Sequence, residues 1–323
     1  MTTGSRLTAR PLGPDETAFA AHAVRAVQPR HPWSEEELRL HWEMSDRMGQ
    51  RRTLVLEEAG RPAGWVEATM WDEAPEKASR VLVHVPAAGP DQLDQAWAIV
   101  EETAGDLGAR LGRATVWEDD AATLEALRRR DWEEKRRERY WRLELAGQGD
   151  RLRALRDAAR RRVDAAGVRI ATADELGGEA VYPALYQLED VTAGDIPRDI
   201  ARVSIPYEAW LVWMRPPAIA PERVWVALVG DRLVGVSYLD YGATPVSTAY
   251  TGVLREHRGA GIARALKLEK MVQAIELGVE AVETDNDEAN APILHLNEEL
   301  GYGEIPGLVK LHKPLGAGGG GAS

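Results

Sequence analysis

A short glycine-rich segment stands between an apolar stretch and a helix-like stretch of the chain. The segment is RGAG, residues 258–261, and the residues after it are apolar at helical spacing until Leu277-Gly278. The first N–H groups of such a helix have no partner within the helix, and its dipole is positive at that end. Glycines let an anion approach the backbone, and Arg258 suits phosphate oxygens. The segment therefore predicts a phosphate-binding turn.

Two other phosphate-binding motifs do not fit this turn. A dinucleotide-binding turn needs a third glycine at its sixth position, where the chain has Arg264. A nucleoside-triphosphate loop needs Gly-Lys followed by Ser or Thr, and the segment has no such sequence.

The elements that position the turn occur twice along the chain. Residues 53–71 and 224–241 each predict two strands joined by a turn, with Gly64 and Gly235 in equivalent places. A further strand, a long helix, a short strand and a second helix follow in both halves. The chain is therefore predicted to hold two copies of one mixed α/β unit. The expected boundaries are a first domain at residues 1–148, a helical linker at 149–167, a second domain at 168–315, and a disordered Gly-rich tail at 316–323.

The second copy resembles the GCN5-related N-acetyltransferase (GNAT) family. The family signature of Gln or Arg, two residues, Gly, one residue, and Gly or Ala is matched by Arg258, Gly261 and Ala263. A second family landmark, an Asn that opens the next helix, is matched by Asn290, and Gly301-Tyr302 ends that helix. The resemblance implies two tandem GNAT-like domains, each a mostly antiparallel twisted sheet flanked by helices.

The resemblance also implies which residues bind acyl-coenzyme A. In the family the turn holds the pyrophosphate and the preceding strand pairs with the pantetheine arm. Carried onto this sequence, the cofactor-binding positions are Thr251, Gly252, Val253, Arg255, Arg258, Gly259, Ala260, Gly261, Ile262, Ala263, Asn290 and Asn297.

The catalytic groups are less clearly indicated. Asn297 occupies the position of the family's frequent tyrosine, which protonates the departing thiolate, and an amide cannot act as a general acid. Three residues are candidates for proton transfer. Asp285 follows a short predicted strand, and Tyr250 lies on the strand that in the family runs beside the cofactor. Glu189 lies in the region that in the family covers the site of the acceptor amine. Each carboxylate is equally compatible with a solvated surface position, and Tyr250 with a core position.

The first copy is predicted to have lost the cofactor site. Ala88-Gly89-Pro90-Asp91 stands where residues 258–261 stand in the second copy. Pro90 has no N–H, and Asp91 would set a carboxylate beside phosphate. This two-copy layout is similar to that of the mycothiol synthases of actinobacteria, whose catalytic strand glutamate falls at about Ser247 here.

Composition limits the other function classes. The chain has 323 residues and no cysteine, which excludes disulfides and cysteine nucleophiles and fits a cytoplasmic protein. From Val163 onward 23 Asp and Glu stand against 13 Lys and Arg, so a nucleic-acid partner is not expected. The seven histidines lack metal-ligand spacing, and no apolar run could span a membrane. A monomer or homodimer is expected.

These observations predict an N-acyltransferase that moves an acyl group, most simply from acetyl-CoA, directly onto an amine of a small metabolite or natural product. The acidic second half motivates a cationic acceptor. The alternative from another class is a non-catalytic module that binds acyl-coenzyme A as a sensor or acts as a protein-interaction scaffold. Asn297 at the tyrosine position is the main support for that alternative.

Overall fold

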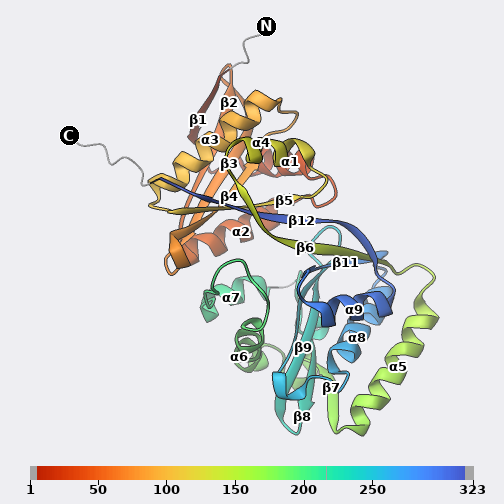
Figure 1. Ribbon diagram of the computed structural model, residues 1–323. Coiled ribbons are helices and arrows are strands. Elements are labelled where there is room, and N and C mark those ends of the chain that lie inside the picture. Colours follow the sequence, from red (N-terminus) through yellow and green to blue (C-terminus); the bar gives the residue numbers. More distant parts are fainter. Residues whose placement is uncertain (1–5, 216, 317–323) are drawn as a thin grey trace. The chain divides into compact units, whose positions relative to one another are not determined.

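The computed structural model describes residues 6–215 and 217–316, so the predicted tail from residue 317 onward lies outside the described residues. The chain forms two compact units (Figure 1). Among the described residues, the first unit holds 6–138, Asp199–Val203 and 306–316. The second unit holds Arg139–Arg198 and Ser204–Ile305.

The first unit is built on one sheet between two layers of helices. A hydrophobic cluster lies on each face of this sheet. Trp65 and Val66 are neighbours on one strand and belong to different clusters, because successive side chains of a strand point to opposite faces. The strands are β1 (Leu7–Pro11), β2 (Gly49–Glu58), β3 (Arg61–Trp71), β4 (Ala78–His84) and β5 (Leu111–Trp117). The helices are α1 (Thr17–Val27) and α2 (Glu35–Met48) on one face, α3 (Pro90–Asp106) on the other with α4 (Ala121–Arg129) packed against it, and the short η1 (Pro75–Lys77).

The second unit repeats this arrangement. Its strands are β7 (Val168–Thr172), β8 (Trp225–Val229), β9 (Arg232–Asp240), β10 (Ser247–Val253) and β11 (Ala281–Asp287). Its α-helices are α5 (Gly149–Ala165), α6 (Tyr182–Ala193), α7 (Tyr207–Trp213), α8 (Ile262–Glu276) and α9 (Ala291–Leu300). The short helices are η2 (Asp174–Leu176), η3 (Gly178–Val181), η4 (Pro221–Arg223) and η5 (Arg255–His257). Figure 1 shows α6 and α7 on one side of the strands and α5, α8 and α9 on the other.

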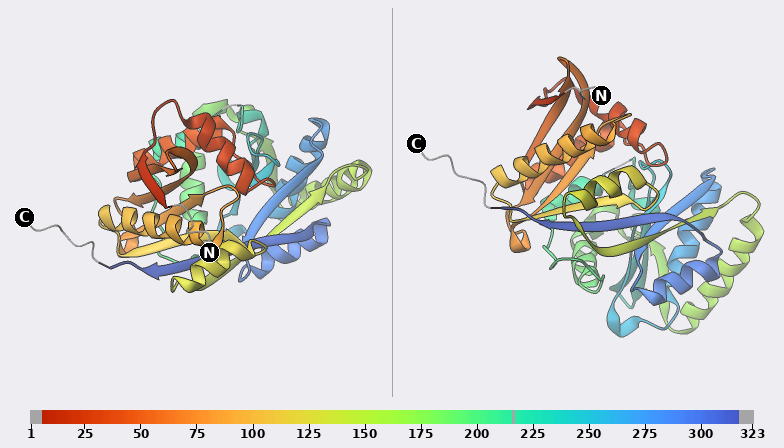
Figure 2. Two further views of the ribbon diagram at one scale, coloured as in Figure 1. Left: turned by 90° about the horizontal axis from the view of Figure 1, so that it is seen from above. Right: turned by 45° about the horizontal axis from the view of Figure 1, so that its top comes forward.

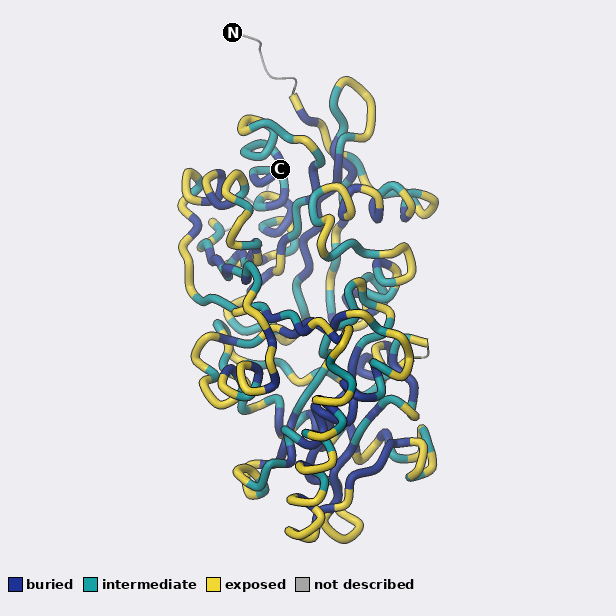
Figure 3. Tube along the Cα trace, turned by 90° about the vertical axis from the view of Figure 1, so that its right-hand side faces the viewer, coloured by how far each residue is buried: buried dark blue, intermediate teal, exposed yellow. Residues whose placement is uncertain are grey.

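In both units the strands pair mostly antiparallel, as the sequence predicted. In each unit one pair is parallel, β4 with β5 and β10 with β11. The β10–β11 register joins Ser247 to Glu283, near the start of both strands. Figure 3 shows the buried interior segments in dark blue, with exposed turns and loop ends in yellow.

The last strand of each copy is exchanged, which differs from the predicted boundaries. Strand β12 (Gly303–Pro314) pairs antiparallel with β5, and the blue C-terminal strand runs beside the yellow strands of the first unit in Figure 2. Strand β6 (Glu133–Glu144) is the neighbour of β11 in the strand order. Residues from Pro306 onward therefore belong to the first unit, and residues 139–167 to the second. The segment predicted as a linker is helix α5, which packs against α8.

Candidate functional site

The glycine-rich turn has the backbone that the sequence indicated. Gly259 has φ of 80° and Gly261, the N-cap of α8, has φ of 91°, a left-handed region that favours glycine. No side chain caps the helix, and its first turn holds no acidic residue. A Cβ added at Gly259 would meet nothing within 4 Å, so the backbone there is open. The start of α8 therefore offers unpaired N–H groups to an anion.

Three arginines surround this turn. Nε of Arg258 donates to the carbonyl of Val253 over 3.0 Å, which anchors its guanidinium beside the end of β10. Both Arg258 and Arg255 form ion pairs with the carboxylate of Asp195. Arg162 on α5 comes close to Gly261, with its Nε 3.5 Å from the place of an added Cβ. The turn is thus strongly basic, and two of its arginines are paired with the carboxylate of Asp195.

Asp195 is anchored by those arginines, which make its carboxylate a weaker base. The hydrogen bonds from Arg255 and Arg258 lower the pKa of its carboxyl group, so it is ionised at neutral pH. Asp199, another acid of the same segment, accepts from Arg113 at 2.8 Å and pairs with His312 at 2.7 Å. Both acids are therefore neutralised by the chain itself, which weakens the charge argument for a cationic acceptor.

Strand β10 carries the residues assigned to the pantetheine arm. Gly252 lies so close to α6 that a Cβ at this position would come within 2.5 Å of Oγ1 of Thr192. The hydroxyl of Thr251 lies 2.7 Å from Oγ of Ser237 on β9. Val253 is buried, and Arg255 after it is exposed. A tight helix contact thus fixes the strand directly before the turn.

Glu189 is buried beside β10. Its Oε2 accepts from Nε1 of Trp210 over 2.8 Å and its Oε1 accepts from the hydroxyl of Tyr238 over 2.9 Å. Burial raises the pKa of Glu189 from the ordinary 4.5 to about 7, and these two hydrogen bonds oppose the shift only in part. The Tyr250 hydroxyl lies 2.8 Å from Oγ1 of Thr192 and donates to the backbone carbonyl of Glu189 over 3.2 Å. Two of the three predicted catalytic residues, Glu189 and Tyr250, are therefore neighbours.

The remaining predicted residues lie on β11, α8 and α9. Asp285 is exposed on β11. Asn290 is the N-cap residue of α9, as expected of the Asn that opens this helix, but its side chain makes no capping hydrogen bond. Asn297 is fully buried and accepts from Nζ of Lys267 over 2.7 Å. Ile262, at the first position of α8, is buried, whereas Ala260 and Ala263 are partly exposed around it.

The corresponding turn of the first unit is built differently. Helix α3 begins at Pro90 after the N-cap Gly89, and Asp91 lies in its first turn. Oε1 of Gln92 accepts from the backbone N–H of Gly89 over 3.1 Å, which occupies one of the donors. Proline supplies no N–H and Asp91 adds negative charge, so this helix end offers an anion much less than α8 does.

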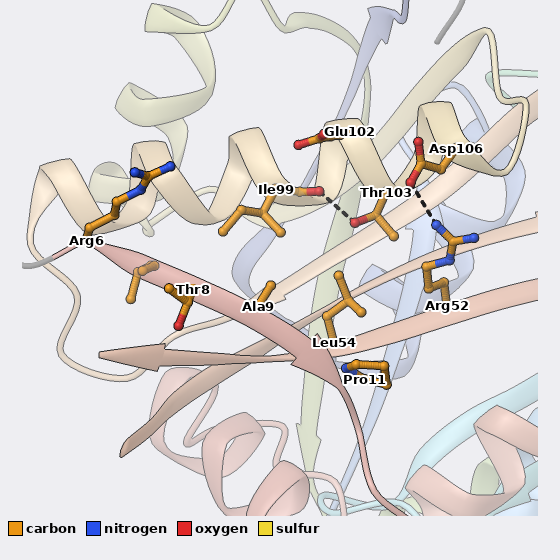
Figure 4. Close-up of a pocket in the computed structure, with 11 residues that line it drawn as sticks. Arg6, Thr8, Ala9, Pro11, Arg52, Leu54, Ile99, Glu102, Thr103 and Asp106 are labelled. Atoms are coloured by element: carbon orange, nitrogen blue, oxygen red, sulfur yellow. Dashed lines mark hydrogen bonds and ion pairs between the residues drawn. The ribbon is translucent and has the colours of Figure 1, made fainter. Parts of the chain in front are cut away.

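The first unit has cavities, and two of them are lined by residues outside the predicted set. One of about 630 Å³ is bounded by β1, β2 and α3, and Figure 4 shows Arg52 paired with Asp106 at its rim, over 2.8 Å. The other, of about 350 Å³, is lined by residues of β4 and β5 and by Trp97 of α3. Neither cavity is lined by residues of the turn at 258–261.

Several side chains of the candidate site were not predicted from the sequence. Arg162 comes from the segment expected to be a linker, and Trp210 and Tyr238 support Glu189 from positions 21 and 49 residues away. The only sign of Arg162 in the sequence is that residues 151–162 are rich in arginine, and this does not show that one of them lies beside the turn at residues 258–261.

Two further classes of site are absent from the described part of the chain. Within residues 6–215 and 217–316, no group of three or more His, Asp or Glu side chains is arranged to hold a metal ion. Over the same residues, no helix has both the length and the apolar character needed to cross a membrane.

Solved structures with the same fold were found by comparison. One is a tandem GNAT protein from the clavulanic acid biosynthesis pathway, solved without AcCoA; it is 21% identical, with a TM-score of 0.70 over 96% of this chain and 99% of that one. A GCN5-related N-acetyltransferase from Sphaerobacter thermophilus is 20% identical, with a TM-score of 0.64 over 96% of both chains. A GCN5-related glucosamine N-acetyltransferase region of a fungal multi-domain β-N-acetylglucosaminidase is 12% identical, with a TM-score of 0.67 over 97% of this chain and 38% of that one.

No family model and no curated protein matches the sequence. At these identities the solved structures are evidence for the fold, and they agree with the resemblance found in the turn and the repeat. The chain has the fold of a tandem GNAT protein.

Proposed function

We propose that the second unit transfers an acyl group, most simply acetyl, from acyl-coenzyme A to an amine of a small molecule. The observation that carries the proposal is the turn at residues 258–261, where an uncapped helix start with open backbone meets three arginines. These donors suit a diphosphate, which is the anionic part of coenzyme A. The first unit would serve as a scaffold, because its own turn carries proline and a carboxylate.

The residues of the second unit fit the parts of acyl-coenzyme A. Arg258, Gly259 and the N–H groups at the start of α8 would hold the pyrophosphate. The backbone of Thr251 and Val253 on β10 would hold the pantetheine arm. Bound in this way, the coenzyme supplies the activated acyl group.

Glu189 is the proposed general base. An amine must lose a proton to attack a thioester, and a base works best when its pKa lies near the operating pH. Burial brings the pKa of Glu189 to about 7, and its neighbour Tyr250 lies on the strand that would hold the coenzyme. In the proposed reaction the amine nitrogen forms the new bond to the acyl carbon, the carbon–sulfur bond breaks, and the amine proton goes to Glu189.

The acceptor is proposed as an uncharged or modestly charged amine rather than a strong cation. Asp195 and Asp199 pair with arginines of the chain, so they do not leave free negative charge for a cation. Two similar structures are named for clavulanic acid biosynthesis and for glucosamine N-acetylation, which favours a metabolite or natural product as the acceptor. In a cell this chemistry suits the cytoplasm, where acyl-coenzyme A is made and used.

A panel assay tests this function. Coenzyme A and acetyl-CoA are titrated calorimetrically into the protein, and thiol release from acetyl-CoA is followed with a thiol-reactive dye over glucosamine, amino acids, polyamines and aminoglycosides. The chain has no cysteine, so the dye reports only the coenzyme. We expect binding and amine-dependent thiol release. Absence of binding refutes the proposal, and tight binding with no turnover on any amine favours the sensor alternative.

A further inference from the structure

The cavity of about 350 Å³ in the first unit lies where two parallel strands separate. Strand β4 pairs with β5 over residues 78–80 and 111–113, at the start of both strands. The cavity is lined by the residues after this pairing, 81–84 on β4 and 115–117 on β5. The separation of the strands therefore creates a space within the sheet, and its volume is in the range of small-molecule sites.

Two buried aromatic side chains that line this cavity have polar atoms without a hydrogen-bond partner. His84 on β4 is 1% exposed, and Trp97 on α3 is 3% exposed. Among the residues that the structure describes, none forms a hydrogen bond with either ring nitrogen of His84 or with Nε1 of Trp97. Buried polar groups are rarely left unpaired, because they have lost their bonds to water. Three such atoms at one cavity indicate a ligand that supplies the missing partners.

The two side chains approach the cavity from opposite faces of the sheet. The ring centroid of His84 lies 4.5 Å from that of Trp65, which packs in the cluster formed with α1 and α2. Trp97 belongs to the cluster on the other face, beneath α3. A molecule between the separated strands would therefore contact both side chains.

The charges around the cavity disfavour an anionic ligand. Of the described residues that line it, Arg30 is basic, whereas Asp119 and Asp120 are acidic. Nη2 of Arg30 lies 2.7 Å from Oδ2 of Asp119, so the basic group is already neutralised. Burial lowers the pKa of His84 to about 3, so its ring is uncharged at neutral pH and offers one donor and one acceptor.

Aromatic rings and an ion pair form the outer wall of the cavity. The rings of Trp117 and His31 are stacked, with their centroids 4.4 Å apart. The guanidinium of Arg30 lies over the Trp117 ring, 5.4 Å from its centroid. The side chains of Arg30 and Asp119 are 45% and 49% exposed, which places their ion pair at the surface. An exposed ion pair contributes little to stability, so it does not oppose the entry of a ligand.

We propose that the first unit binds an uncharged, flat heteroaromatic molecule of one or two rings in the cavity between β4 and β5. An acceptor of this molecule pairs with Nε1 of Trp97, and its other polar groups pair with the ring nitrogens of His84. The inference goes beyond acyl transfer and does not depend on coenzyme binding in the second unit. It gives the first unit a ligand of its own, different from the anion that its turn at residues 88–91 disfavours.

The test is calorimetric titration with matched uncharged and anionic probes. Nicotinamide and indole-3-carboxamide are flat and uncharged at neutral pH, whereas nicotinate and indole-3-carboxylate have nearly the same shapes and a negative charge. We expect at least one of the amides to bind at one site per chain. Its affinity should exceed that of the matching carboxylate by about tenfold or more, because an unpaired charge is costly to bury.

Three variants locate the site. His84→Phe keeps an aromatic ring but removes both nitrogens, so the affinity for the amide should fall by about tenfold or more. The variant should unfold at the same temperature as the unmodified protein or a higher one, since no group of the described chain loses a hydrogen bond. Trp97→Phe removes the other donor and should also weaken binding. His22→Phe, at an exposed position on α1, is the matched control and should bind as the unmodified protein does.

The outcomes separate the ligand class from the location. If neither amide binds at millimolar concentration, the cavity holds only water and the proposal is overturned. Equal affinity for an amide and its carboxylate overturns the uncharged ligand class. Binding that is the same in H84F and W97F as in the unmodified protein overturns the site, and W97F keeps this test available if H84F does not fold. Coenzyme A binding is measured separately, so the acyl-transfer proposal can fail without this one.

Discussion

Replacing Glu189 by glutamine should remove the proposed base and, at the same time, stabilise the protein at alkaline pH. The substitution keeps the shape of the side chain. A glutamine oxygen still accepts from Nε1 of Trp210, and a glutamine amide still pairs with the hydroxyl of Tyr238, the two groups that contact the carboxylate. The variant therefore differs from the unmodified protein mainly in having no ionisable group at this buried position.

The size of the stability effect follows from the pKa. Burial raises the pKa of Glu189 from 4.5 to about 7, so between these values the folded state binds more protons than the unfolded state. The contribution of the carboxyl group to stability is thus fully present below pH 4.5 and is lost as the pH rises to 7. At 1.36 kcal/mol per pKa unit, the loss is ~3 kcal/mol above pH 7. Glutamine does not ionise and should not show this loss.

Denaturant unfolding at several pH values measures the effect directly. The free energy of unfolding of E189Q, relative to the unmodified protein, should increase by ~3 kcal/mol between pH 4.5 and pH 8. E208Q, at an exposed glutamate on α7, is the matched control and should show no such trend. In the acyl-transfer assay kcat/KM of the unmodified protein should rise with pH through about 7, and E189Q should lose at least about 100-fold. A stability difference that does not change with pH would refute the buried, raised-pKa carboxyl group.

Two further predictions concern the turn. Gly261→Asp should weaken coenzyme A binding by about 100-fold or more in calorimetry, because it places a carboxylate against the pyrophosphate and strains a residue with φ of 91°. Gly259→Asn is the control, since asparagine tolerates a positive φ and adds no charge, and equal losses in both variants would mean that backbone strain rather than charge is responsible. Asp195→Asn should tighten coenzyme A binding by about tenfold at low salt, because Arg255 and Arg258 lose their internal partner, and the gain should shrink as salt screens the charges. Unchanged affinity of D195N at low salt would show that these arginines do not contact the ligand.

The parts of the site that depend on neighbouring residues were predictable from the sequence. The turn at residues 258–261 is one such part, since the need for positive φ at Gly259 and Gly261 and the free N–H groups at the start of α8 follow from residues close in the chain. The weakened turn of the first unit was predicted for the same reason, from Pro90 and Asp91. The repeat predicted the order of strands and helices in both units.

The parts that depend on distant contacts were not predictable. Burial raises the pKa of Glu189, and the hydrogen bonds from Trp210 on α7 and Tyr238 on β9 oppose that shift only in part. A sequence shows that an acid is present but not how much water surrounds it, so Glu189 could not be separated from Asp285 as a candidate base. The ion pairs of Asp195 likewise weakened the charge argument for a cationic acceptor, and they could not be predicted because both arginines lie about 60 residues further along.

The exchanged strands give a physical reason why a copy with a weakened turn is retained. A sheet edge with unpaired N–H and C=O groups is prone to wrong pairing, and it is protected when another strand covers it. Strand β6 is the last strand of the first copy, yet residues 139–144 belong to the second unit, where Arg142 contacts Glu283 of β11 over 3.0 Å. Strand β11 also carries Asp285, one of the predicted catalytic residues. Loss of the first copy would therefore remove the strand that completes the sheet around the second copy's site, so selection for that site would preserve both copies even if only one of them binds coenzyme A.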